Sequence, residues 1–159
     1  SILAALTAHR TAKPDTAKNR VVSWASSDET IATINSRGIA TFLKIGTVQF
    51  TATTTDGSNK TAITSAIQVI QYVTSIVVNE TLTSATTSNT SVTLTATVKP
   101  DNANTKTVAW SSSDGAIATI NATTGKVTFL SSGKVTFTAT AQDGSRVKGN
   151  SKEITVTAA

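Results

Sequence analysis

The sequence of 159 residues contains no cysteine and no methionine, one histidine, two prolines and only 4% aromatic residues. Without cysteine it has no disulfide framework, no thiolate nucleophile and no cysteine-type zinc site. A single histidine cannot build a histidine-cluster metal site. No apolar run approaches the ~20 residues of a membrane-spanning helix, so we predict no membrane insertion. What is abundant is threonine and serine, which together make up about a third of the chain and suit small, Val/Ile/Thr-rich strands.

The net charge of +5 raises the question of nucleic-acid binding, because the sequence pI is about 9.8. Charged residues make up only 14% of the chain, and most of the cations are scattered singly. Their one loose cluster is interrupted by Asp15 and consists of Arg10, Lys13, Lys18 and Arg20. Nucleic-acid modules usually concentrate their cations on one face. We therefore predict a solvated, mildly basic surface and no nucleic-acid partner.

The sequence contains an internal repeat. The segment Val22–Asn35 (VSWASSDETIATIN) recurs as Val108–Asn121 (VAWSSSDGAIATIN), and Gly38–Thr53 recurs as Gly125–Thr140. The offset is 86 residues for the first pair and 87 for the second, because the intervening turn is one residue longer in the second copy. Well over half of these aligned positions are identical. Two copies of about 87 residues therefore account for nearly the whole chain.

The hydrophobic pattern of each copy predicts short strands and no helix. In copy two, Val92–Val98 (VTLTATV) and Lys134–Ala141 (KVTFTATA) each alternate between apolar and polar residues and are predicted as continuous strands. This period of two, with turn signals every ~8–12 residues, is typical of an antiparallel sandwich or barrel. About seven strands in ~87 residues, with one tryptophan on the third strand, describe an immunoglobulin-like sandwich. The predicted fold class is all-β, with two tandem immunoglobulin-like β-sandwiches.

The motif W-x-S-S-[DG], followed by A-T-I-N-x-x-G-x-x-T-F-L-x-x-G-x-x-x-F-T-A-T, resembles the bacterial immunoglobulin-like group 2 family. Copy two matches over Val73–Thr157 and copy one over Lys13–Val69. The resemblance implies non-catalytic modules of bacterial surface proteins, such as intimin- and invasin-like adhesins, or of phage tail and capsid proteins. The motif is a signature of the fold and names no ligand.

We predict an incomplete domain over residues 1–71 and a complete domain over residues 72–159. Counting back from Trp24 with the spacing of copy two, about 15 residues that correspond to Val73–Thr87 have no counterpart before Ser1. The first sandwich is therefore expected to lack its N-terminal strand. The last strand of copy one and the first strand of copy two are separated by a short segment without glycine or proline, so we expect an end-to-end pair with limited bending.

Three sources of the missing strand are open: an upstream segment, a neighbouring subunit that adds a strand, or Ser1–Ala8 itself. The apolar run at the N-terminus is followed too closely by the turn at Pro14 to supply both the first and the second strand. We therefore favour the first two sources. The expectation is that Ser1–Ala12 contacts another subunit or an upstream domain.

Six aromatic residues are predicted to form the structural core of the two domains: Trp24, Phe42, Phe50, Trp110, Phe129 and Phe137. The tryptophans could instead be sugar-stacking platforms. Their position in register with Val22 and Val108 favours core packing.

The acidic residues offer the remaining chemistry. Asp28 and Asp114 follow Ser-Ser in a loop after the tryptophan strand, where they either cap a turn or lend oxygens to Ca²⁺. Asp56 and Asp143 each precede a glycine, as in ordinary hairpin turns. Calcium needs about six to eight oxygens, which favours capping. Because both copies carry the same isolated acids, a catalytic pair is disfavoured, and we predict no catalytic residue, no metal and no cofactor.

These features favour a non-enzymatic structural or spacer module of an extracellular assembly, either a phage virion or a bacterial surface fibre. Its expected partners are neighbouring subunits or upstream domains of the same assembly. One alternative is an adhesion module that binds a cell-surface glycan or a host protein. Another is an accessory domain of a surface hydrolase. The residues do not separate a phage virion from a bacterial cell surface.

Overall fold

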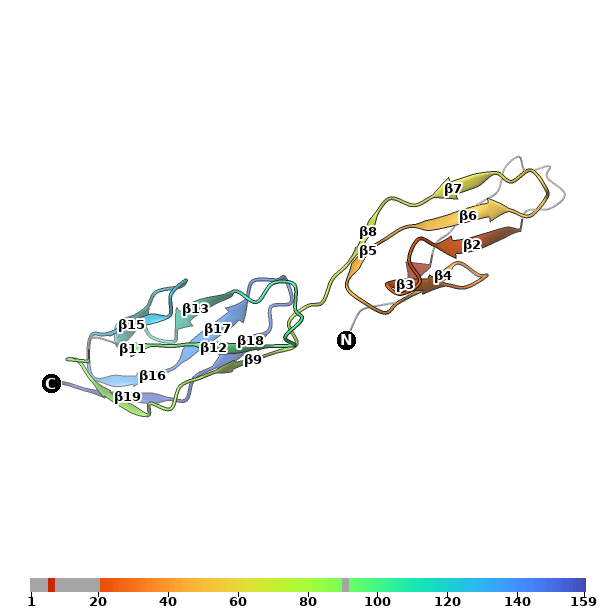
Figure 1. Ribbon diagram of the computed structural model, residues 1–159. Helices are drawn as coiled ribbons and strands as arrows, with labels where there is room; N and C mark the ends of the chain where they lie inside the picture. Colours follow the sequence, from red (N-terminus) through yellow and green to blue (C-terminus); the bar gives the residue numbers. More distant parts are fainter. Residues whose placement is uncertain (1–5, 8–20, 90–91) are drawn as a thin grey trace. The chain divides into compact units, whose positions relative to one another are not determined.

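The computed structural model describes residues 6–7, 21–89 and 92–159 (Figure 1). It divides the chain into two compact units, unit 1 (Ser1–Gln71) and unit 2 (Tyr72–Ala159). The described residues form strands, turns and bends, with no helix among them, which confirms the all-β prediction.

Unit 1 contains the short strands that its alternating apolar residues predict. They are β1 (Leu6–Thr7), β2 (Val22–Ser26), β3 (Ala32–Ile34), β4 (Ile39–Phe42), β5 (Gly46–Val48), β6 (Phe50–Thr54), β7 (Thr61–Ile63) and β8 (Ile67–Val69). The strand that carries the tryptophan, β2, pairs antiparallel with β6, and β6 pairs with β7. A second group has the order β1-β4-β3, and β5 pairs with β8.

Unit 2 repeats this pattern and adds strands at its beginning. Its strands are β9 (Ser75–Val78), β10 (Ser84–Thr86), β11 (Val92–Thr93), β12 (Ala96–Lys99), β13 (Val108–Ser112), β14 (Ala118–Ile120), β15 (Lys126–Phe129), β16 (Gly133–Val135), β17 (Phe137–Ala141), β18 (Lys148–Asn150) and β19 (Ile154–Thr157). The added strands are β9, which pairs antiparallel with β12, and β10, which pairs parallel with β19. The described part of unit 1 has no counterpart of either.

Two stretches predicted as single strands are each divided between two sheets. Val92–Val98 becomes β11, which pairs with β15, and β12, which pairs with β9. Lys134–Ala141 becomes β16, which pairs with β19, and β17, which pairs with β13. The prediction of continuous strands was wrong because residues between the halves leave the ladder.

Serine hydroxyls stabilise the second of these divisions. The Ser113 hydroxyl accepts the backbone N–H of Thr136 at 2.9 Å, and the Ser151 hydroxyl accepts that of Phe137 at 2.9 Å. In unit 1 the Ser27 hydroxyl likewise accepts the backbone N–H of Gln49. A strand that changes sheets loses ladder partners for its N–H groups, and buried N–H groups need replacements. Some of the serines of this chain therefore stabilise the fold by accepting backbone N–H groups.

Each unit has its own apolar core. In unit 2 a large cluster extends from β9 and β10 across to β17 and β19 and includes Ile76, Ala85, Trp110, Phe137 and Ile154. Among the described residues of unit 1, the cluster is smaller and consists of Ala32, Ala40, Val48, Phe50 and Val69. Strands β9 and β10 contribute Ile76, Val78 and Ala85 to the cluster of unit 2, and the described part of unit 1 has no counterpart of these strands.

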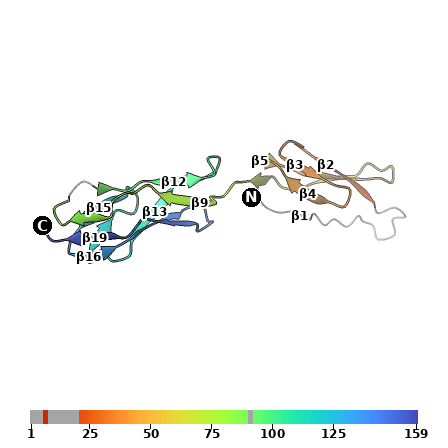
Figure 2. The same ribbon diagram turned by 90° about the horizontal axis from the view of Figure 1, so that it is seen from below.

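The N-terminal contacts expected for Ser1–Ala12 lie outside the described residues, apart from the backbone of β1. This strand pairs with β4, with Leu6 opposite Ala40 (Figure 2). In unit 2 the counterpart of β1 is β11, and Val92 lies opposite Val127 in the same register. Strand β1 therefore corresponds to β11 and not to β9 or β10.

Candidate functional site

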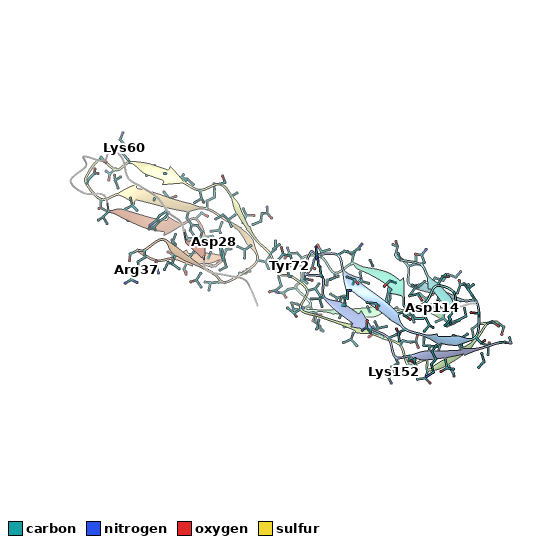
Figure 3. The ribbon with its side chains drawn as sticks, turned by 180° about the vertical axis from the view of Figure 1, so that it is seen from behind. Asp28, Arg37, Lys60, Tyr72, Asp114 and Lys152 are labelled. Carbon is teal, nitrogen blue, oxygen red and sulfur yellow. The ribbon has the colours of Figure 1, made fainter. Side chains whose placement is uncertain are left out.

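The Ser-Ser-Asp loops form repeated polar turns, one in each unit (Figure 3). In unit 1, Asp28 Oδ1 accepts the backbone N–H of Thr30 at 2.8 Å and the Thr30 hydroxyl at 2.6 Å. In unit 2, Asp114 Oδ1 accepts the N–H of Ala116 at 2.8 Å. These bonds within the loop are those of a turn cap, which is one of the two interpretations open from the sequence.

The Asp-Gly-Ser turns are a second repeated feature, and here the two units differ. Asp56 and Asp143 each accept the N–H of the serine two residues later at 2.9 Å and its hydroxyl at 2.5 Å. In unit 2, Asp143 Oδ2 also accepts the N–H of Val73 at 2.5 Å. Asp143 therefore fixes the backbone at the beginning of unit 2. Asp56, its counterpart in unit 1, makes no equivalent hydrogen bond to a described residue.

These hydrogen bonds explain why the pKa values of three of the aspartates are lowered. Hydrogen bonds from Thr30 lower the pKa of Asp28, and those from Ser58 lower the pKa of Asp56. At Asp143, partial burial raises the pKa, but the hydrogen bonds from Ser145 and Val73 outweigh it, so the pKa lies below its usual value. All three carboxylates are therefore held in the charged form.

In the described part of the chain, no group of three or more His, Asp or Glu side chains lies close enough to hold a metal ion. No helix among the described residues has the length and apolar character that crossing a bilayer requires. The single histidine, His9, and the cation cluster that begins at Arg10 lie outside the described residues.

The six aromatic residues assigned to the core lie on the paired strands. Phe50, Phe137, Phe129 and Trp110 are buried, with exposures of 0%, 0%, 4% and 6%. Trp24 and Phe42 are half-buried and pack against the edge of the smaller cluster in unit 1. Trp24 and Phe42 are thus less completely covered than Trp110 and Phe129, whereas Phe50 is buried as fully as Phe137.

The outer edge of β8 is the candidate functional site. We define the β8 edge as the backbone of Ile67–Ile70 on the side away from β5. Strand β8 pairs with β5, and the two run side by side in Figure 1. In unit 2 the equivalent edge of β19 is occupied by β10. Within the described residues nothing pairs with the β8 edge, so unit 1 presents backbone hydrogen-bonding groups that unit 2 covers.

In unit 2, Gly149 of β18 lies directly against the backbone of β9. A Cβ built on Gly149 in β18 would lie 2.4 Å from the carbonyl oxygen of Ile76 in β9, closer than atoms pack. The counterpart of Gly149 in unit 1 is Ala62 in β7, which pairs with Ala52 as Gly149 pairs with Ala139. Aligning the two copies position by position reveals this difference, but the sequence does not say that a backbone lies against the glycine.

The family model for the bacterial Ig-like domain (group 2) matches residues 4–65 and again residues 72–157. The chain therefore belongs to the bacterial Ig-like group 2 family and carries two tandem immunoglobulin-like domains, as the motif predicted.

Relatives of known source include a phage protein. An Ig-like virion protein of Serratia phage KSP90 is 36% identical over 138 residues, which cover 84% of this chain and 52% of that protein. An uncharacterised protein of Clostridium acetobutylicum is 35% identical over 131 residues, which cover 82% of this chain and 13% of that protein. The chain thus spans about half or less of the length of these relatives.

Among solved structures, domains 1–6 of the surface layer protein SbsC are similar to this chain. The identity is 20%, the match covers 87% of this chain and 20% of that chain, and the TM-score is 0.44.

The contact between Asp143 and Val73 leads to a first prediction. Asp143→Asn removes a charged acceptor from a partly buried N–H, and we expect the melting temperature of unit 2 to fall by about 4–8 °C, the shift produced by a loss of about 1 kcal/mol. The matched control is Asp56→Asn, which lacks the Val73 contact and should change unit 1 less. Calorimetry of both variants measures this difference.

The same pair predicts a pH dependence. The pKa of Asp143 in the folded state lies below its usual value of 3.8, so the stability that this carboxylate contributes is fully present above that pH. This contribution to the free energy of unfolding is lost as the pH falls through the lowered pKa of Asp143. The stability gap between wild type and Asp143→Asn should therefore be widest near neutral pH and close in acid. A gap that stays constant down to pH ~2 would contradict the assignment of this carboxylate as a charged acceptor.

Proposed function

We propose that this chain is a non-enzymatic structural spacer of an extracellular assembly, either a phage virion or a bacterial surface fibre. The observation that carries the proposal is the similarity to the Ig-like virion protein of Serratia phage KSP90, which extends over 84% of this chain and so includes both copies. A spacer needs stable, repeated domains and no binding chemistry of its own. Partners in this role are neighbouring subunits or adjoining domains of the same assembly.

The distribution of polar groups supports the same role. Four aspartates accept hydrogen bonds within their own turns: Asp28, Asp56, Asp114 and Asp143. Because the same turns recur in both copies, they serve the fold that the copies share. A recognition site present in only one copy would break this symmetry.

Binding measurements test the spacer against the adhesion alternative. The recombinant chain is applied to a glycan array and to a panel of whole cells, with detection through a terminal tag. We expect no saturable binding. Saturable binding to one glycan class or one cell type would overturn the spacer proposal in favour of adhesion.

A matched variant controls for nonspecific capture. Leu43 and Leu130 occupy the same loop position in the two copies and are 51% and 52% exposed. The double variant L43S/L130S removes these apolar side chains from the surface. A signal that disappears in this variant and does not saturate in the wild type is hydrophobic adsorption, which leaves the spacer proposal standing.

A further inference from the structure

Strands β2, β6 and β7 of unit 1 lie side by side and form one sheet (Figure 1). Side chains along a strand alternate between its two faces, so one face of this sheet packs on the core and the other points outward. We define the open face of unit 1 as two outward rows that cross the three strands in register: Ala25, Thr51 and Ile63, and Ser23, Thr53 and Thr61. None of these six residues is charged, and Ile63 is 63% exposed.

The equivalent face of unit 2 has a different chemistry. By the repeat spacing, Ile63 corresponds to Asn150 and Thr61 corresponds to Lys148. Two more cations flank β18 where unit 1 has uncharged residues: Arg146 and Lys152. Unit 2 therefore presents a solvated, cationic face, whereas unit 1 presents an exposed apolar side chain among uncharged neighbours. An exposed apolar group in such surroundings is typical of a contact with another protein.

Unit 2 shows that the strands at the beginning of a unit do not cover this face. It contains both β9 and β10, and yet Ser111, Lys148 and Asn150 on the outward side of its β13-β17-β18 sheet are exposed. Strand β10 pairs with β19, and β9 lies against Gly149, which is buried on the inward side. A segment that supplied these two strands to unit 1 would therefore leave its open face uncovered, so the occupant must be something else.

The geometry of the open face makes it complementary to itself. The first row places the small Ala25 on one outer strand and the large Ile63 on the other, with Thr51 between them. A two-fold axis parallel to β6 that brings two open faces together sets β7 of one copy over β2 of the other. Ile63 of each copy then meets Ala25 of the other. In the second row, the same operation sets Thr61 over Ser23, which pairs one hydroxyl with another.

The charge of the chain favours the same face. With a net charge of +5, two copies repel each other, and they do so least where they meet without charged side chains. In the equivalent pairing of unit 2, Lys148 would lie where Thr61 lies in unit 1. Burying its ammonium group without a carboxylate partner is strongly unfavourable. Unit 1 is therefore the unit whose open face admits a second copy of the chain.

We propose that the open face of unit 1 binds the open face of a second copy of this chain, with Ile63 of each copy packed against Ala25 of the other. The two sheets lie face to face, as in the aligned packing of a sandwich. Six residues per copy are far fewer than the about 20–30 of a standard interface, so the association is weak and depends on a high local concentration. This inference goes beyond the proposed function, because it holds for a spacer and for an adhesion module alike.

Sedimentation equilibrium of the full chain, from about 10 µM to about 1 mM, tests the proposal. We expect reversible dimers at the upper end of this range. The double variant Thr61→Lys with Ile63→Asn should remain monomeric. Its new residues stand at the equivalent positions of unit 2, so the fold accommodates them. Leu43→Ser is the matched control, because Leu43 is 51% exposed but lies outside the open face, and it should leave the dimer unchanged.

Ala25→Ile distinguishes the two-fold arrangement from nonspecific apolar adsorption. The larger side chain fills the space that Ile63 of the second copy occupies, so the arrangement predicts loss of the dimer. Nonspecific adsorption would instead increase with the added apolar surface. Stronger association of Ala25→Ile than of the wild type would overturn the proposal.

Two further results would also overturn it. A wild-type chain that stays monomeric throughout the concentration range would exclude a second copy as the occupant of this face. Dimers that persist in the variant with Thr61→Lys and Ile63→Asn would place the contact on another surface.

Discussion

Replacing Trp110 with alanine is expected to lower the free energy of unfolding of unit 2 by about 3–5 kcal/mol, the usual loss when a buried aromatic site is emptied. Trp110 is 6% exposed and lies at the centre of β13, opposite Ala139 of β17. The chain has no cysteine, so no disulfide limits the unfolding of the weakened unit. Calorimetry should show the transition of unit 2 moving to a much lower temperature.

Trp24→Ala is the matched control for this prediction. Trp24 occupies the same position in β2, opposite Ala52, but it is only half-buried and packs against a smaller cluster. Less apolar surface returns to water when it is truncated, so the loss in unit 1 should be smaller. Equal losses in the two units would show that burial does not account for the role of the tryptophan.

Gly149→Ala is the second large effect that we expect. The added methyl group would lie 2.4 Å from the carbonyl oxygen and 2.9 Å from the carbonyl carbon of Ile76. The obstacle is backbone, which cannot rotate away as a side chain can, so β9 must shift from β18. Overpacking of this kind costs about 1–3 kcal/mol. The loss should appear in chemical denaturation of unit 2.

The reciprocal variant Ala62→Gly provides the control. It places glycine at the equivalent position of unit 1, where the described residues contain no counterpart of β9. It should lower stability by no more than the about 0.5–1 kcal/mol that glycine costs in a strand. In a Trp24→Phe background, Trp110 fluorescence reports on unit 2 alone. Unchanged denaturation of Gly149→Ala in that background would show that β9 moves away from β18 without loss.

Much of the fold was predictable from the sequence because the repeat and the alternation are local patterns. The alternation of Phe137, Ala139 and Ala141 places one face of β17 inward, and these residues are buried as expected. The recurrence of one tryptophan motif at a nearly constant offset indicated two domains of one family, which the family match confirms. Both inferences need only the period of two of a strand and the comparison of a sequence with itself.

The partner of each strand was not predictable in this way. A period of two marks the inward face but does not name the neighbour, so the divisions between β11 and β12 and between β16 and β17 were missed. At the division between β16 and β17, the hydroxyls of Ser113 and Ser151 accept backbone N–H groups. In the sequence, these two serines are only part of a serine-rich composition. Their role requires that two distant segments meet.

The sequence by itself determined that the chain is all-β, that it is duplicated and that its second copy is a bacterial Ig-like domain, because composition, period and repeat are properties of neighbouring residues. Only the tertiary structure decided that the edge of β19 is covered by β10 while no described residue covers the β8 edge. It also decided that Gly149 and Ala62 face different surroundings. Edge pairing and close backbone approach depend on segments far apart in the chain, and no local pattern encodes those distances.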